Sequence, residues 1–264
     1  MKFAAGSFFN TSFYENIRLA SEYGFKGIEM LSWQDIDLEL TRDTLLKHDM
    51  TLSAILLGSR DKTTHAATSW HHGMVHEDAV EPIIKAFRET AEAAKILGTK
   101  NIVMITGAER DDISREAQLE NCAAALRTIA PMAYEAGLCI VVEPLNRLVD
   151  HRGYFLNTSA DGFKLIKMVD SPAVRVLFDI YHQQITEGNL IRNITENIDL
   201  IGHFHIADNP GRCEPGTGEI NYPKIFEAIK KTGYAGWLAF ECGRTVSSEE
   251  MAKNMRSLTM PFEE

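Results

Sequence analysis

The sequence predicts one α/β domain, a (β/α)8 barrel in which parallel strands are surrounded by helices. Three observations favour this fold. Short apolar segments alternate with longer amphipathic ones along the chain, as repeated strand–helix units require. A length of 264 residues is usual for such a barrel. Because no linker or shift in composition divides the chain, we expect residues 1–264 to form a single domain.

The expected strands are short runs rich in Ile, Val, Leu and Phe, as in strands covered on both faces. They span Phe3–Phe8, Gly27–Leu31, Thr51–Leu57, Asn101–Thr106, Leu138–Glu143, Val174–Asp179, Ile201–Ile206 and Trp237–Glu241. An open doubly wound sheet is the competing arrangement, and it usually carries a glycine-rich phosphate turn after its first strand. Residues 6–10 lack the GxGxxG pattern, so the barrel is favoured.

Capping signals mark the expected helices. Ser12 and Glu15 have the spacing of a capping box, and Gly24 ends the helix that they open. Two other expected helices are Glu77–Leu97, which ends at Gly98, and Arg115–Glu135, which ends at Gly137. Two more begin after caps at Asn221 and Ser247. A proline in the first turn after Asn221 supports that assignment.

The composition excludes several classes of protein. Hydrophobic residues make up 45% and charged residues 24%, which excludes a disordered or collagen-like chain. A net charge of −10 argues against binding to nucleic acid, because phosphate contacts need clustered Lys and Arg. The apolar runs are shorter than the ~18–20 residues that span a bilayer, so we expect no membrane partner. We expect no signal peptide, and the four scattered cysteines are typical of reduced thiols in a cytoplasmic protein.

Four of the later strands end in residues that bind metal ions, and the C-terminal strand ends are where barrels carry their catalytic groups. These residues are Glu143, Asp179, His205 and Glu241, spaced 36, 26 and 36 positions apart. Each interval is about one strand–helix unit, so each residue comes from a different strand. Three carboxylates and an imidazole suit Mg²⁺, Mn²⁺ or Co²⁺ better than a thiol-loving metal. Acids that merely end strands in solvent are the alternative, but four equivalent positions favour a shared site.

Several segments in the C-terminal half resemble one known family. They are Val142–Asn146, Gly153–Thr158, Phe178–His182, Gly202–Asp208 and Gly211–Tyr222. In these segments the chain resembles the hydroxypyruvate isomerase family, within the xylose-isomerase-like TIM barrel superfamily. The resemblance implies a (β/α)8 barrel with a divalent metal held by Glu143, Asp179, His205 and Glu241. It also implies isomerisation of the aldose–ketose type, such as hydroxypyruvate to tartronate semialdehyde, on a small-molecule substrate, and it leaves a homo-oligomer as an expectation.

Such isomerisation moves a proton between adjacent carbons through an enediolate, which needs a Lewis acid on the oxygens and a base near the carbon. The resemblance implies that Glu143 and Glu241 are the acid/base pair. We expect His182 to hydrogen-bond a substrate oxygen, with a loop cap or packing under Tyr181 as the alternative. Arg212 is expected to bind a substrate carboxylate or hydroxyl, with a surface salt bridge as the alternative.

Two departures from the family concern the substrate. Hydroxypyruvate isomerases often carry Gln where His205 stands, and His at this place is more similar to ketose 3-epimerases. Trp33 and the segment Trp70–His76 also differ from the loops of hydroxypyruvate isomerases and would shape the substrate end of the pocket. The alternative function is therefore a ketose 3-epimerase or an isomerase of a four- to six-carbon sugar or oxo-sugar acid.

Other interpretations have weaker support. A metal-dependent phosphodiesterase of the same superfamily would need further His and Asp ligands and a basic groove, which the charge of −10 disfavours. A non-catalytic sugar-binding protein would not need the acids that this chain carries. The cluster of His71, His72 and His76 is more typical of a solvated loop than of a second metal site. His203 is expected to be a hydrogen-bonded core residue, and the glycines at 216 and 218 are a weak sign of a phosphate loop.

Overall fold

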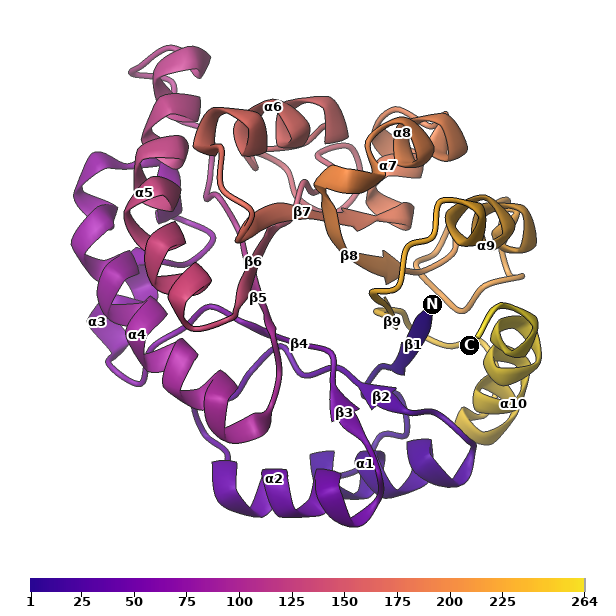
Figure 1. Cartoon of the computed structure of the whole chain (residues 1–264). Coiled ribbons are helices and arrows are strands. Elements are labelled where there is room, and N and C mark those ends of the chain that lie inside the picture. The colour runs from indigo at the N-terminus through magenta and orange to yellow at the C-terminus, as the bar shows by residue number, and fades with distance from the viewer. Residues whose placement is uncertain (264) are drawn as a thin grey trace.

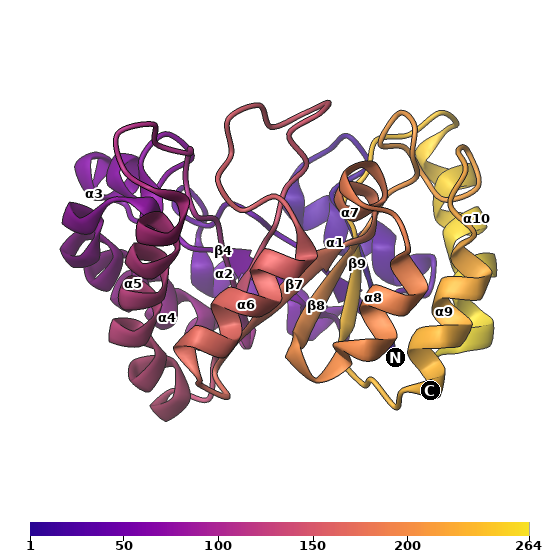
Figure 2. The same ribbon diagram turned by 90° about the horizontal axis from the view of Figure 1, so that it is seen from above.

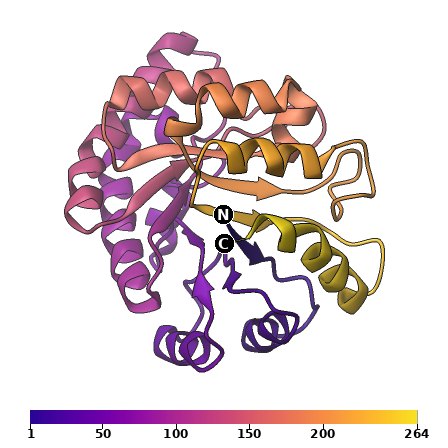
Figure 3. The same cartoon turned by 45° about the vertical axis from the view of Figure 1, so that its right-hand side comes forward.

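Parallel strands form the centre of the molecule and helices form its outside (Figures 1 and 3). The computed structural model describes residues 1–263. The strands in this range are β1 (Lys2–Ala5), β2 (Gly27–Ile28), β3 (Thr51–Leu52), β4 (Ala54–Leu56), β5 (Asn101–Met104), β6 (Cys139–Val142), β7 (Val174–Asp179), β8 (Ile201–Ile206) and β9 (Trp237–Phe240). All pair in parallel, in the order β3-β2-β1-β9-β8-β7-β6-β5-β4.

The ring closes through a strand that is interrupted at Ser53. The predicted strand Thr51–Leu57 is divided there into β3, which pairs with β2, and β4, which pairs with β5. The Ser53 main-chain N–H donates to the Ile28 carbonyl (2.9 Å), while the Ser53 carbonyl accepts from the side-chain amide of Asn101 (3.0 Å). The predicted eight strands thus appear as nine segments, and the predicted (β/α)8 barrel is confirmed.

Most of the helices begin at a residue whose side chain caps the first turn. They are α1 (Phe13–Glu22), α2 (Leu38–Lys47), α3 (Lys62–Ala67), α4 (Val80–Leu97), α5 (Arg115–Glu135), α6 (Ser159–Val169), α7 (Ile180–Thr186), α8 (Leu190–Glu196), α9 (Tyr222–Lys231) and α10 (Ser248–Thr259). Ser12, Asn221 and Ser247 each accept a hydrogen bond from a main-chain N–H in the first turn of their helix, as predicted. Only the predicted start at Glu77 is early, because residues 77–79 form a 3-10 turn before α4.

A small apolar layer fills the barrel beneath the ends of the strands. It is separate from the main core between strands and helices and consists of Ala54, Val103, Val141 and Leu177. Val141 lies two residues before Glu143, and side chains two apart on a strand share a face. Leu177 has the same relation to Asp179. This layer therefore supports the ends of the strands from below.

The loops at the C-terminal ends of the strands vary in length. The longest-reaching loop in Figure 2 joins β6 to α6 and extends above the strands. It contains Asn146 and His151. No helix within residues 1–263 is long and apolar enough to cross a membrane.

Candidate active site

The four residues predicted to bind a cation lie together at one end of the barrel. Glu143 directly follows β6, Asp179 ends β7, His205 lies near the end of β8 and Glu241 directly follows β9. Each offers one ligand atom, and these atoms all lie within 4.8 Å of one another. Asp179 and His205 are direct partners in the register of β7 and β8. The structure therefore brings four distant parts of the chain into one cluster.

One nitrogen of His205 faces the three carboxylates. Its Nδ1 lies 3.0 Å from Glu143 Oε1, 3.2 Å from Glu241 Oε2 and 4.0 Å from Asp179 Oδ2. Asp179 Oδ2 is buried and has no hydrogen-bond partner among residues 1–263. A buried carboxylate oxygen without a partner is costly, and a cation removes that cost. Oxygen and imidazole donors also suit a hard or borderline divalent cation, so these residues fit the predicted metal.

Asp179 uses its two oxygens differently. Oδ1 accepts the main-chain N–H of His182 (3.0 Å) and so caps α7 at its N-terminus. Oδ2 points instead toward the cluster, 3.6 Å from His182 Nε2. The helix cap thus fixes the orientation of the carboxylate that faces His205.

Glu29 is a buried part of the site that the sequence reasoning missed. It follows β2, and the Nε2 atoms of His205 and His203 donate to its Oε1 (2.6 Å) and Oε2 (2.8 Å). The hydroxyl of Ser53 donates to Oε2 as well (2.7 Å). His203 is therefore a hydrogen-bonded core residue, as expected. The available signal was an acid within the otherwise apolar segment Gly27–Leu31.

The two glutamates of the cluster have opposite electrostatic environments. Burial raises the pKa of Glu143 above its ordinary value, and His205 only partly offsets this. Burial also tends to raise the pKa of Glu241, but His205 and the Arg212 guanidinium outweigh this effect and lower the pKa below its ordinary value. Burial lowers the pKa of His205, yet Glu29 and Glu143 raise it well above the ordinary value. Only Glu241 therefore has a guanidinium partner beside the shared imidazole.

Arg212 and His182, both predicted to contact substrate, border the cluster. The Arg212 Nη2 donates to Glu241 Oε2 (2.7 Å), and its guanidinium lies over the ring of Tyr181, 5.4 Å from the centroid. The side chains of Arg212 and Glu241 are 29% and 30% exposed, so this pair is partly buried. His182 is fully buried, and burial lowers its pKa. Its ring makes edge contacts with Tyr181 and His151.

Comparison with known proteins assigns the fold to a family. Residues 17–259 match the model of the xylose isomerase-like TIM barrel. The chain belongs to this family. Hydroxypyruvate isomerase of Escherichia coli (strain K12) is 32% identical over 235 residues, which cover 87% of each chain. The 2-oxo-tetronate isomerase of Cupriavidus necator is 38% identical over 154 residues, 57% of each chain.

A solved structure supports the same assignment. The crystal structure of an AP endonuclease, family 2, from Brucella melitensis is 28% identical, with a TM-score of 0.86 over 100% of this chain and 99% of that chain. The relatives named as isomerases confirm the prediction that this xylose isomerase-like barrel is an isomerase.

The two tryptophan segments have different surroundings in this xylose isomerase-like barrel. Trp33 is buried in the core, where its Nε1 donates to the Leu56 carbonyl (3.1 Å). Trp70 instead stacks on Tyr154 with an interplanar angle of 14°, and its ring lies 4.9 Å from that of His151. Since His151 contacts His182, Trp70 is joined to the cluster through two imidazole rings.

The histidines that follow Trp70 form a separate group. His72 and His76 stack with their centroids 3.8 Å apart, and His72 Nε2 lies 2.8 Å from Asp78 Oδ1. His71 is exposed, but the buried Val75 fixes this segment to the barrel by donating its main-chain N–H to the Thr106 carbonyl (3.2 Å).

The suspected phosphate loop at residues 216–218 has another partner. Asp208 is buried and its carboxylate accepts the main-chain N–H groups of Gly216 (2.7 Å), Asn209 (2.9 Å) and Ile220 (3.1 Å). A phosphate would need these same donors. The loop is therefore organised around a carboxylate of the chain itself.

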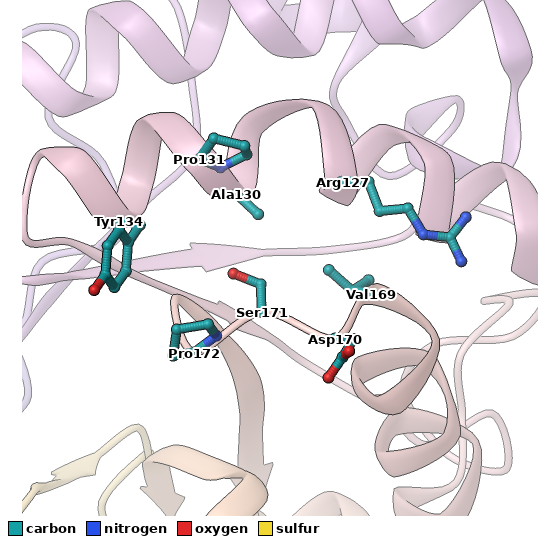
Figure 4. A pocket seen from close by; sticks show the side chains of 8 residues that line it. All are labelled: Arg127, Ala130, Pro131, Tyr134, Val169, Asp170, Ser171 and Pro172. Carbon is teal, nitrogen blue, oxygen red and sulfur yellow. The ribbon is translucent and has the colours of Figure 1, made fainter.

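Two hollows differ in their relation to the cluster. A cavity of about 250 Å³ is lined by Gly6, Ser7, Glu29, Leu31, Phe240, Glu241 and Cys242. It contains both Glu29 and Glu241 and so adjoins the cluster. A groove on the outside, between α5 and the turn after α6, is lined by residues that include Tyr134 and Ser171 (Figure 4). This turn precedes β7, whereas Asp179 lies at the other end of that strand.

Proposed function

We propose that this chain is a divalent-metal-dependent isomerase of a small hydroxy-carbonyl compound. Hydroxypyruvate, interconverted with tartronate semialdehyde, is the first substrate to test. The convergence of Glu143, Asp179, His205 and Glu241 carries the proposal. The two isomerases to which the chain is similar support it, because both of their names denote small 2-oxo acids.

Mg²⁺, Mn²⁺ or Co²⁺ would be held by Glu143, Asp179, His205 and Glu241. When bound there, such a cation supplies Lewis-acid stabilisation of the negative charge that develops on the substrate oxygens.

Glu143 and Glu241 are placed for proton transfer. β7 and β8 lie between the strands that carry them, so the two carboxylates approach the mouth from different sides. A small substrate between them has one carboxylate near each of two adjacent carbons. One glutamate removes the carbon-bound proton to give an enediolate, and a protonated glutamate returns a proton to the neighbouring carbon. The hydroxyl proton passes from its oxygen to the former carbonyl oxygen, so that the carbonyl and the hydroxyl exchange places.

Two further residues bind and orient the substrate. His182 donates a hydrogen bond to a substrate oxygen from the buried side of the cluster. Arg212 neutralises a substrate carboxylate through its planar fork of donors, at the side where Glu241 lies. The positive charge of the Arg212 guanidinium is the reason to prefer an oxo acid over an uncharged sugar as the substrate.

The second candidate is epimerisation or isomerisation of a ketose or an oxo-sugar acid of four to six carbons. His205 favours it, since ketose 3-epimerases are similar to this chain at that position. The same residues would serve: one glutamate removes the proton, and the other returns it to the same carbon from the opposite face.

The test is turnover of a substrate panel by the purified protein loaded with Mg²⁺, Mn²⁺ or Co²⁺ in turn. Hydroxypyruvate, 2-oxo-tetronate and several ketoses are followed by NMR. We expect turnover of an oxo acid with the highest kcat/KM. Preferred turnover of a ketose supports the second candidate, and absence of turnover on the whole panel contradicts both. Asp179→Asn should be inactive, whereas Asp170→Asn, at an exposed position, is the matched control.

A further inference from the structure

The two nitrogens of His182 have different surroundings. Nδ1 lies 2.6 Å from the side-chain Nδ2 of Asn146 and 3.4 Å from the main-chain nitrogen of the same residue. Nε2 is buried and has no hydrogen-bond partner among residues 1–263. Asp179 Oδ2, 3.6 Å away, is beyond hydrogen-bond distance of it.

The orientation of the Asn146 amide is fixed independently of His182. Its Oδ1 accepts the main-chain N–H groups of Val149 (3.0 Å) and Asp150 (3.2 Å), so the other amide atom is the NH₂ group. One hydrogen of this group donates to Asp150 Oδ2 (2.8 Å). The hydroxyl of Tyr181 donates to the same oxygen (2.8 Å) and completes the network. The second hydrogen of the NH₂ group is directed to Nδ1 of His182.

An NH₂ group and a main-chain N–H can only donate, so Nδ1 of His182 must accept. The ring then carries its proton on Nε2. The opposite tautomer would set an N–H group against two N–H donors and leave a buried lone pair near the Asp179 carboxylate.

We propose that Asn146 is a positioning residue that fixes His182 in the Nε2–H tautomer, so that the ring offers a hydrogen-bond donor to a substrate oxygen. The role toward substrate rests on the proposed function, but the tautomer itself does not. An imidazole with its proton on Nε2 cannot take a proton at that atom. His182 therefore donates to the oxygen on which charge develops, and the proton at carbon is left to Glu143 and Glu241.

The experiment uses Mg²⁺-loaded protein labelled with ¹⁵N-histidine. Long-range ¹⁵N–¹H correlation separates protonated from unprotonated ring nitrogens, and the missing signals of a His182→Gln variant assign His182. For the wild type we expect a protonated Nε2 and an unprotonated Nδ1. A wild type with its proton on Nδ1 overturns the proposal, whether or not the Asn146 variant folds.

The variant Asn146→Asp tests the cause. It keeps the size and the Oδ1 acceptor but replaces the donor with an acceptor, so Nδ1 of His182 should become protonated. We expect kcat/KM to fall by roughly 10- to 100-fold, with most of the loss in kcat, because the donor to the developing charge is misplaced. Asn254→Asp, which adds the same charge on an exposed face of α10, is the matched control and should leave both spectrum and rate unchanged.

The outcomes separate this proposal from the proposed function. The predicted tautomer without turnover on any substrate would contradict the proposed function and leave the assignment of the tautomer standing. Turnover by a wild type whose His182 carries its proton on Nδ1 would contradict the assignment of the tautomer and leave the proposed function standing. A variant whose Nδ1 becomes protonated while kcat stays unchanged would confirm that Asn146 sets the tautomer but refute its role in positioning a donor for the reaction. A variant whose Nδ1 stays unprotonated would refute the role of Asn146 in setting the tautomer.

Discussion

Oε1 of Glu29 lies 2.6 Å from Nε2 of His205, on the side of the ring opposite to Nδ1, which faces Glu143. A carboxylate that accepts the N–H of an imidazole fixes its rotation and tautomer and makes the other nitrogen a better ligand. Glu29 thus acts on the candidate metal site without belonging to the four residues predicted to hold the cation. Its own orientation depends on Ser53 and His203.

The first prediction concerns Glu29→Gln. The amide is a weaker acceptor than the carboxylate, so His205 is held less firmly, and we expect affinity for Mn²⁺ to fall roughly 10- to 100-fold. Isothermal titration calorimetry measures this directly. Glu249→Gln, on an exposed turn of α10, is the control. Unchanged affinity in Glu29→Gln would show that the carboxylate does not support His205.

The second prediction is metal dependence. Three carboxylates in one buried cluster repel one another unless a cation is present, so treatment with a chelator should abolish activity. Added Mn²⁺, Co²⁺ or Mg²⁺ should restore it, and Asp179→Asn should bind the cation less tightly than wild type. Activity assays paired with metal analysis check both. Full activity in thoroughly demetallated protein would exclude the shared site.

The third prediction concerns Glu143→Gln and Glu241→Gln. Each keeps the size of the side chain but removes the proton-transfer group, and we expect a loss in kcat of roughly 10²- to 10⁴-fold. Bound metal must be measured beside the rate, because both residues are also expected ligands. In D₂O the wild-type product should carry deuterium from solvent on the carbon that gains the proton. A metal-replete variant with nearly the wild-type rate would refute the two-glutamate mechanism.

The fourth prediction separates acid from uncharged substrates. Arg212→Lys keeps the charge but loses the planar fork, so KM for an oxo acid should rise by roughly tenfold. KM for a ketose should change less, because no carboxylate is there to bind. Steady-state kinetics of wild type and Arg212→Lys on an oxo acid and on a ketose measure both changes in KM. Equal small effects on all substrates would indicate that Arg212 serves only its pair with Glu241.

The fifth prediction concerns stability away from the chemistry. Asp208→Asn replaces one acceptor oxygen with an NH₂ group facing the N–H groups that the carboxylate binds. We expect the free energy of unfolding to fall by about 1–3 kcal/mol. Urea denaturation followed by circular dichroism gives the change in midpoint. Asp111→Asn, at an exposed position, should leave the midpoint unchanged.

Much of the fold and of the cluster could be predicted because the signals are local. Apolar runs and caps such as Ser12 and Asn221 specify strands and helices from neighbouring residues. Parallel strands then bring their C-terminal ends to one edge, so Glu143 and Asp179 had to lie near one another once the barrel was assumed.

The parts that could not be predicted depend on contacts between distant segments. Glu29 and His205 are 176 positions apart, and nothing local to either residue indicates the other. Trp70 stacks on Tyr154, which lies on the loop after another strand. The direction of the Asn146 amide is set by the fold of its own loop. Such contacts between distant segments can be identified only from the three-dimensional structure.

Ser53 links the architecture of the ring to the chemistry at its mouth. The residue connects the first and last strands of the sheet order through its main chain, and its hydroxyl holds the carboxylate behind His205. Anyone who opens the barrel at this seam, by circular permutation or by inserting a reporter, would therefore also disturb the imidazole that faces the cluster. The seam is thus a poor place for engineering, although the strand there is already broken.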